Sequence, residues 1–217
     1  MHWYKNTIEH YPKDLPFFYR KFYKYYFPKY AKKSTRIATV SEFSKNDISE
    51  KYAISPSKID VVYNGKNEMY LTVEESIIIE TQKKYTLGCP YFLFVGSLHP
   101  RKNIVNMLLA FDDFKKSVDS NFKFLIVGSK KWWATEMQST LEHMVFKKDV
   151  IFVGRLDSDS LKTVIPSAFS MVYVSHFEGF GVPIIEAFAS GVPVITSNVT
   201  SMPEVANNSA ILVNPFS

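Results

Sequence analysis

Short apolar runs alternate with longer segments of helical periodicity throughout the chain after Tyr91. Near-continuous runs of β-branched and aromatic residues are typical of strands that are buried on both faces. The predicted strands are 91–96, 122–128, 150–154, 171–175, 192–196 and 210–213, and the predicted crossover helices lie around 103–118, 131–146, 158–168 and 183–190. This alternation predicts an α/β fold with a parallel, doubly wound sheet.

A shorter βαβ-like unit precedes this sheet. It consists of a predicted strand at 36–40, a helix over 42–52 and a second strand at 58–63. Ser41 is suited to cap the helix, because its hydroxyl can accept a hydrogen bond from a free backbone N–H of the first turn. A polar stretch over 64–90 then separates the two parts of the chain.

Two glutamates, Glu178 and Glu186, flank a glycine-bracketed turn at 179–181. Pro183 suits the first turn of a helix because its ring presets φ and its missing N–H would be unpaired there. The turn therefore leads to a helix N-terminus whose free amides face a ligand. Helical side chains lean toward the N-terminus of their helix. We therefore expect the Glu186 side chain to point toward the helix start beside which Glu178 lies.

This combination of groups suits a ligand that carries both hydroxyls and phosphate. Carboxylates accept hydrogen bonds from the hydroxyls of a sugar or ribose, while helix-terminal amides favour an anion. A nucleotide-sugar has both features. The alternative is that Glu178 is a solvated loop residue and Glu186 an acid placed to complement the helix dipole.

A basic pair, Arg101 and Lys102, follows the first strand of the large sheet, in a loop opened by Gly96 and turned by Pro100. Such a pair can bind a diphosphate and neutralise the charge that grows on it as a glycosyl bond breaks. The alternative is a solvated pair at a helix start. Ligands of doubly wound sheets bind beyond the carboxyl ends of the strands, where this loop and the turn after Ser175 both fall.

The motifs resemble those of the GT4 glycosyltransferases, the "glycosyl transferases group 1", which have the GT-B fold. Glu178 and Glu186 match the E-x7-E signature, within EGFGVP and before GVPVITS and MPEV. The similarity continues upstream, in the order of the family, through TVSEFSKNDI at 39–48, KIDVVYNG at 58–65, FVGSLHPRKN at 94–103 and IFVGRL at 151–156. It covers nearly the whole chain.

The resemblance implies a retaining, metal-independent transfer of a sugar from a nucleotide-sugar to an acceptor hydroxyl. Glu178, Lys102 and Arg101 would be catalytic. The implied substrate-binding residues are Glu186, Gly179, Phe180, Gly181, Val182, Gly96, Ser97, Gly154, Arg155 and Leu156. In this scheme Glu186 holds the ribose, Glu178 and the amides of Phe180 and Gly181 hold the sugar, and the basic pair holds the diphosphate. Many members carry Arg where this chain has Ser97.

The same comparison divides the chain into three parts. Residues 1–66 would be the end of an N-terminal, acceptor-side domain, 67–90 an interdomain linker and 91–217 a truncated nucleotide-sugar-binding domain. We therefore expect the chain to be incomplete at both ends, without the functional His of the family's N-terminal domain. An alternative function is a non-catalytic nucleotide-binding fragment of such an enzyme.

Composition adds a possible membrane contact. The net charge is +5 and the pI about 9.0, with the excess mainly in the aromatic and basic segment 16–33. Three interpretations are open: an amphipathic helix whose aromatics pack on a sheet, an interfacial helix on acidic lipid, or a platform for nucleic acid bases. The resemblance favours a surface-glycan enzyme at the inner membrane, with a glycan or lipid-linked acceptor and no nucleic acid.

Other features narrow the class of protein. The single cysteine, Cys89, excludes an intrachain disulfide, and no Cys/His cluster has zinc-site spacing. No apolar run reaches the roughly 18–20 residues of a membrane span, and the first ten residues lack a signal-peptide core, so we expect a cytoplasmic protein. No metal or cofactor is expected beyond a UDP- or GDP-linked donor. Asp157 and Asp159 imitate a metal-binding D-x-D but are better explained as a helix cap.

Overall fold

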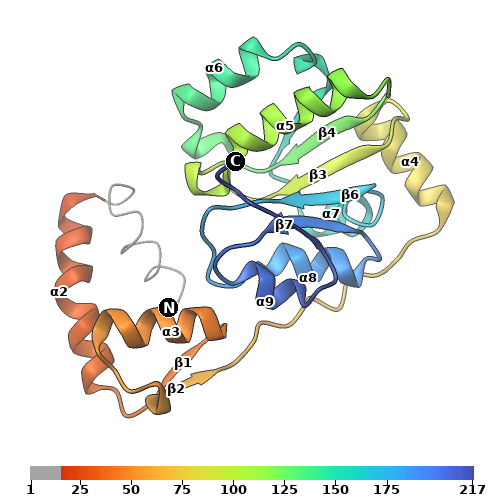
Figure 1. Cartoon of the computed structure of the whole chain (residues 1–217). Helices are drawn as coiled ribbons and strands as arrows, with labels where there is room; N and C mark the ends of the chain where they lie inside the picture. The colour runs from red at the N-terminus through yellow and green to blue at the C-terminus, as the bar shows by residue number, and fades with distance from the viewer. Residues whose placement is uncertain (1–15) are drawn as a thin grey trace.

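The computed structural model describes residues 16–217 and shows two α/β units (Figure 1). The small unit contains α2 (Phe17–Lys33), β1 (Ile37–Thr39), α3 (Glu42–Tyr52), the 3-10 turn η2 (Pro56–Lys58) and β2 (Ile59–Val61). β1 and β2 pair in parallel, with Ile37 opposite Ile59. Ser41 caps α3 as predicted, since its Oγ accepts from the N–H of Ser44 at 3.0 Å.

The small unit has a core of its own, made by Phe27, Ala31, Ile48, Tyr52, Ile54 and Ile59. Most of the aromatic residues of α2 lie outside it. Phe18 is 82% exposed, and Phe17, Tyr19, Phe22, Tyr25 and Tyr30 are also exposed. The interpretation in which these aromatics pack on a sheet therefore holds only for a minority of them.

The large unit is a six-stranded, wholly parallel sheet with the order β5-β4-β3-β6-β7-β8. Its strands are β3 (Tyr91–Val95), β4 (Lys123–Val127), β5 (Val150–Gly154), β6 (Ser170–Tyr173), β7 (Val194–Ser197) and β8 (Ile211–Val213). The chain order of the central strands reverses between β3 and β6, so the sheet is doubly wound, as the alternating pattern predicted.

Helices cover both faces of this sheet (Figure 1). α5 (Ile104–Ser117) and α6 (Thr135–His143) lie over one face, and α8 (Val182–Ala189) and α9 (Met202–Ala206) lie under the other with α7 (Ser158–Val164). Short 3-10 turns occur at η3 (Pro100–Lys102), η4 (Lys130–Trp132) and η5 (Lys147–Asp149). Asp157 caps α7, since its Oδ1 accepts from the N–H of Ser160 at 2.8 Å, which agrees with the cap interpretation of that motif.

Two helices were not predicted, the short α9 and the longer α4. The segment expected to be a linker, 67–90, contains α4 (Glu75–Thr86), which contacts α7, β4 and β5. Thr81 and Thr86 are its buried residues. Because the residues that α4 buries are polar threonines, its inner face carries no apolar stripe from which a helix could be predicted.

The deepest part of the core lies around β3, where Tyr91, Leu93 and Phe94 are fully buried. Each such side chain contributes about 1.5–3 kcal/mol of hydrophobic stabilisation. The Tyr91 hydroxyl donates to the carbonyl of Val164 at 2.7 Å, which joins β3 to the end of α7. β3 is thus a rigid support for the loop that carries the basic pair. Within residues 16–217, no helix is long and apolar enough to span a bilayer.

Candidate functional site

The candidate site lies at the carboxyl edge of the sheet, where the loops after β3 and β6 meet. These strands are neighbours, with Phe92 opposite Ser170. η3 lies in the loop after β3 and carries the basic pair, while the loop after β6 carries Glu178. The N–H of His176 donates to the carbonyl of Arg101 at 2.9 Å, so backbone bonding joins the two loops.

Glu178 forms ion pairs with both cations predicted from the sequence. Its Oε1 lies 2.5 Å from Nζ of Lys102, and its Oε2 lies 2.9 Å from Nη1 of Arg101. All three side chains are about 95% buried. The alternatives in which Glu178 is a solvated loop residue and the cations a solvated pair are therefore wrong. We call these three residues the ion triad.

The formal charges of the ion triad sum to +1 inside the protein. Burial raises the pKa of Glu178, but the charges and hydrogen bonds of Lys102 and Arg101 outweigh that effect and leave the pKa below its usual value. Burial lowers the pKa of Lys102, the charge of Arg101 lowers it further, and Glu178 opposes both only in part. Arg101 and Glu178 thus form a neutral pair, and Lys102 is a surplus buried cation. Buried charge of this kind is costly unless an anion compensates it.

Tyr173 is a fourth member of the site that the sequence analysis missed. Its hydroxyl accepts a hydrogen bond from Nζ of Lys102 at 2.5 Å, and the same Nζ lies 4.6 Å from the centre of the Tyr173 ring. The ring stacks on Phe94, and burial raises the pKa of the phenol well above its usual value. Tyr173 is the last residue of the apolar strand β6. The only feature of the sequence that could have indicated its contact with Lys102 is a hydroxyl group at the carboxyl end of that strand.

Arg101 is held by the backbone of the facing loop. Its Nη1 donates to the carbonyl of Phe177 at 3.1 Å as well as to Glu178. Its own N–H donates to Nδ1 of His99 at 3.2 Å, which caps η3. Both cations therefore have fixed positions before any ligand arrives, which is the property that electrostatic stabilisation of a reacting group requires.

The predicted helix start after the glycine-bracketed turn is confirmed. α8 begins at Val182, with Pro183 in its first turn and Gly181 at the cap position with φ 110°. A Cβ at Gly181 would lie 3.0 Å from Cδ1 of Ile184, so both backbone angle and space favour glycine.

Glu186 lies on α8 and is half-buried. Burial raises the pKa of its carboxyl group, and its charge acts on the buried Tyr70. Within residues 16–217 no ion pair or hydrogen bond engages the Glu186 carboxylate. The structure thus places one predicted glutamate against the cations and leaves the other available to hydroxyls.

The remaining predicted residues follow β3 and β5 at the same edge. The Cβ position of Gly96 lies 3.9 Å from Cε of Lys102, and Ser97 continues that loop. Gly154 ends β5 and Arg155 is exposed beyond it, while Leu156 packs against the core. Since β5 is two strands away from β3, this group lies roughly 10 Å to one side of the ion triad.

The small unit touches the turn directly. The hydroxyls of Ser41 and Ser44 donate to the carbonyl of Gly179 at 2.7 and 3.1 Å. Glu204 of α9 accepts from the first two amides of α3, those of Glu42 at 2.7 Å and Phe43 at 3.1 Å. The two units are therefore joined beside the ion triad.

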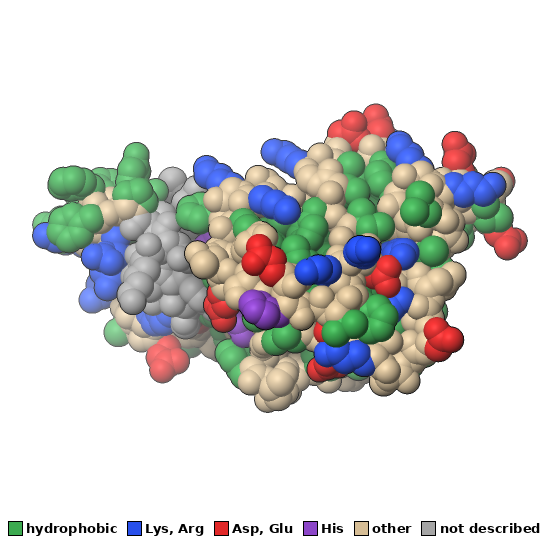
Figure 2. Space-filling model, turned by 90° about the horizontal axis from the view of Figure 1, so that it is seen from above, with side chains coloured by type: hydrophobic (Ala, Val, Ile, Leu, Met, Phe, Trp, Pro, Cys, Tyr) green, Lys and Arg blue, Asp and Glu red, His purple; other side chains and the backbone are tan. Residues whose placement is uncertain are grey.

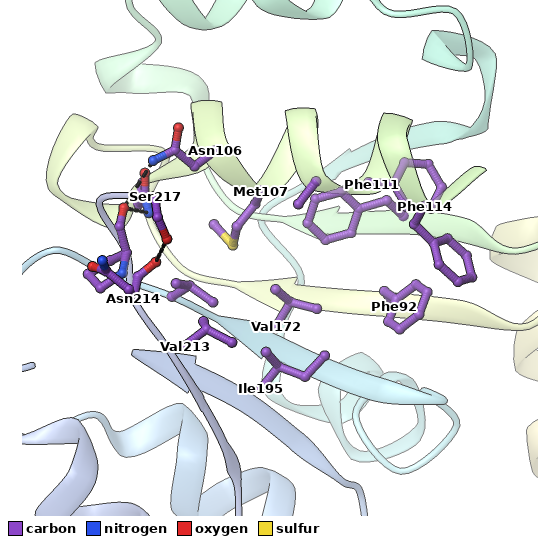
Figure 3. A pocket seen from close by; sticks show the side chains of 15 residues that line it. Phe92, Asn106, Met107, Phe111, Phe114, Val172, Ile195, Val213, Asn214 and Ser217 are labelled. Atoms are coloured by element: carbon purple, nitrogen blue, oxygen red, sulfur yellow. Dashed lines mark hydrogen bonds between the residues drawn. The ribbon is translucent and has the colours of Figure 1, made fainter. Parts of the chain in front are cut away.

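A separate cavity of about 340 Å³ lies between α5 and the sheet (Figure 3). It has no charged lining residue, and its walls are mostly aromatic and aliphatic side chains such as Phe92, Met107 and Ile195. The segment after β8 lines one side of it, where the side-chain amides of Asn103 and Asn106 donate to the carbonyl of Pro215 at 2.9 and 3.0 Å. A charged nucleotide would find no partner there. No group of three or more potential metal ligands occurs within the described residues.

Comparison with known proteins identifies the family of this chain. Residues 78–216 match the family model of the glycosyl transferases group 1, so the chain belongs to this family. It is 32% identical over 206 residues to the O-antigen chain mannosyltransferase RfbU of Salmonella typhimurium, covering 92% of this chain and 54% of that protein. The chain spans about half the length of such relatives.

Solved structures with the GT-B fold have the same architecture. Anabaena HepE, in complex with UDP and glucose, superposes with a TM-score of 0.73 at 17% identity over 86% of this chain and 51% of its own. WaaG, a glycosyltransferase of lipopolysaccharide biosynthesis, gives a TM-score of 0.72 at 16% identity over 97% of this chain and 59% of its own. The fold predicted from the alternating pattern and from the family resemblance is confirmed.

Proposed function

We propose that this chain forms the donor-binding part of a GT4-type retaining glycosyltransferase that builds a cell-surface polysaccharide such as an O-antigen. The donor is a nucleotide-diphosphate sugar, and the acceptor is a hydroxyl of a glycan or of a lipid-linked glycan. The observation that carries the proposal is the ion triad, because a surplus buried cation at the carboxyl edge of a doubly wound sheet stabilises a bound diphosphate.

Each site residue has a role in this proposal. Lys102 and Arg101 bind the diphosphate, and Glu178 holds both cations and accepts a hydrogen bond from a sugar hydroxyl with a remaining lone pair. Glu186 accepts from the ribose hydroxyls. The loops that begin at Gly96 and Gly154 contact the nucleotide.

The transfer step needs no covalent enzyme intermediate. A bond forms between the acceptor oxygen and the anomeric carbon on the face from which the diphosphate leaves. The electron pair of the broken bond departs with the β-phosphate oxygen, and the acceptor proton passes to that phosphate. Lys102 and Arg101 stabilise the charge that develops on the leaving group, and this stabilisation together with positioning supplies the rate.

The relatives support the type of donor. HepE was solved with UDP and glucose, and RfbU is a mannosyltransferase. The proposal covers both UDP-linked and GDP-linked donors. In it, the residues that follow β5 contact the base through backbone groups, which do not select one base.

Calorimetric titration with UDP, GDP and ADP tests the proposal. We expect one of these to bind the wild-type chain and the Lys102→Ala variant to bind it at least tenfold more weakly, since a charge-assisted hydrogen bond and a buried charge are lost. Lys116→Ala, which removes an exposed lysine of α5, is the matched control. The proposal is wrong if the wild-type chain binds none of the three.

The second candidate, a nucleotide-binding fragment without catalysis, is favoured by one observation, the length of the chain relative to its relatives. It predicts the same nucleotide affinity with neither transfer nor hydrolysis of the nucleotide-sugar. Release of UDP or GDP from the donor, measured with and without membrane extract as acceptor, distinguishes the two.

We also propose that the protein is cytoplasmic and that α2 contacts the inner face of the cell membrane. Hydrophobic and basic side chains gather at the end of the molecule that α2 forms (Figure 2). Exposed Phe18, Phe22 and Tyr25 alternate there with Lys21 and Lys29, a pattern that suits anionic headgroups. Sedimentation with phosphatidylglycerol vesicles but not with phosphatidylcholine vesicles is expected.

The vesicle test needs a variant and a control. Phe18→Ser with Phe22→Ser should abolish sedimentation with phosphatidylglycerol vesicles. Val145→Ser, which removes an exposed apolar residue of the large unit, should leave it unchanged. Equal sedimentation of all three proteins refutes a contact through α2, and a shift of nucleic acid in a gel would favour the base-stacking alternative.

A further inference from the structure

Serine hydroxyls hold three successive carbonyls of the turn that follows Glu178. Ser201 Oγ donates to the carbonyls of Glu178 at 3.0 Å and of Phe180 at 2.9 Å. The carbonyl of Gly179, between them, accepts from Ser41 at 2.7 Å and from Ser44 at 3.1 Å. Each backbone carbonyl of residues 178–180 therefore accepts a hydrogen bond from a serine hydroxyl at the start of α9 or of α3.

The same bonds fix the direction of the amides. In a trans peptide unit the N–H of one residue points opposite to the carbonyl of the residue before it, and the described residues contain no cis peptide. Each hydroxyl that holds a carbonyl of 178–180 thus turns the N–H of the next residue, Gly179, Phe180 or Gly181, away from itself. Within residues 16–217 none of these three amides has a protein acceptor.

This row of amides leads into the N-terminus of α8, whose dipole adds positive potential. Successive free amides of a turn can form an anion-binding nest. The serines hold the turn in one conformation before a ligand binds. Binding therefore does not carry the entropic cost of ordering the turn, and the affinity is higher by that amount.

We propose that Ser41, Ser44 and Ser201 are positioning residues of the donor site, which aim the amides of 179–181 at the oxygens of the β-phosphate and of the attached sugar. The inference rests on the proposed function, because it assigns that ligand to the same edge of the sheet. Two of the three serines belong to the small unit, so that unit completes the donor site from across the interface.

Glu204 holds the small unit in position against the turn. Its carboxylate occupies the first two amides of α3 and so holds Ser41 and Ser44 against Gly179. The aromatic pair of Phe43 and Phe177, with ring centres 5.7 Å apart, packs beside this contact. Displacement of the small unit would release the Gly179 carbonyl and with it the N–H of Phe180.

The test compares ligands that do and do not reach the amide row. UDP-glucose and UMP, and GDP-mannose and GMP, are titrated into the wild-type chain and into Ser44→Ala and Ser201→Ala. Each variant should bind the preferred nucleotide-sugar roughly three- to tenfold more weakly, the scale of one or two hydrogen bonds, and the monophosphate unchanged. Ser49→Ala removes a hydroxyl that bonds within the small unit, to the carbonyl of Ile54, and is the matched control.

The outcomes separate this inference from the proposed function. Equal weakening of monophosphate and nucleotide-sugar means a general loss of structure and overturns a positioning role. Unchanged binding of the nucleotide-sugar by both variants also overturns it. If the wild-type chain binds neither kind of ligand, the proposed function itself fails.

A second readout follows one amide directly. Gly181 is the only glycine of the chain that follows phenylalanine, so labelling with ¹³C-carbonyl Phe and ¹⁵N-Gly isolates its N–H signal. We expect this signal to shift when the nucleotide-sugar binds the wild-type chain and to shift less in Ser201→Ala. A Gly181 signal that does not respond to the nucleotide-sugar contradicts the inference, even if Ser44→Ala fails to fold.

Discussion

Replacing Glu178 by glutamine tests the electrostatic account of the site most directly. The substitution keeps the shape of the side chain but removes the only anion of the ion triad. Arg101 and Lys102 would then be two buried cations facing each other, each about 95% buried and now without a counter-charge. Breaking a buried ion pair in this way costs about 3–5 kcal/mol of stability.

The loss should be visible in thermal unfolding. For a protein of this size, each kcal/mol lowers the midpoint by about 2–4 °C, so Glu178→Gln should melt about 6–20 °C below the wild type. Pyrophosphate should raise the midpoint of the variant more than that of the wild type, because an anion replaces the missing charge. Glu142→Gln, at an exposed position of α6, is the control.

A double variant gives the result that would refute this reasoning. Lys102→Met with Glu178→Gln leaves one buried cation instead of two, so the combined loss should be smaller than the sum of the single losses. If the two losses add, or if Glu178→Gln unfolds within about 0.5 kcal/mol of the wild type, the three side chains do not interact as a buried cluster.

Three further predictions follow from the same geometry. A bound diphosphate raises the pKa of Lys102, which burial lowers in the free protein, so affinity should be constant below that lowered pKa and fall as the pH rises through it; calorimetry over a pH series that extends up to the usual pKa of lysine measures this, and a flat profile contradicts it. Tyr173→Phe removes the hydroxyl that accepts from Lys102 and should cost about 1 kcal/mol in urea unfolding, whereas an unchanged midpoint would show that the bond adds nothing. Gly181→Ala should cost about 1–3 kcal/mol, because a side chain is strained at φ 110° and meets Ile184, while Gly65→Ala, with open space around it, should cost far less in the same thermal assay.

The sheet could be predicted well because its central strands, β4, β3, β6 and β7, are largely buried on both faces. Every predicted strand is a strand in the structure, and the cap residues Ser41 and Asp157 lie where their chemistry requires. α4 was missed because its apolar residues are clustered and its buried positions are threonines. A helix of that kind is determined by tertiary contacts rather than by its own pattern.

Most residues of the candidate site were predicted from the sequence, but the contacts among them were not. The sequence indicated that Glu178 and the basic pair share one edge of the sheet, and the structure brings them into direct contact. It did not indicate that each Glu178 oxygen would bind one of these cations, that Tyr173 would join them, or that Ser44 would reach Gly179. Such contacts join residues 71–135 positions apart, and periodicity carries no information about them.

The hydrogen bonds from Asn103 and Asn106 to the carbonyl of Pro215 join residues 112 and 109 positions apart. Asn103 directly follows Lys102, so the segment around Pro215 steadies the backbone next to the surplus cation. A substitution that moves the Pro215 carbonyl would therefore alter anion affinity at Lys102, although Pro215 is not itself a member of the ion triad.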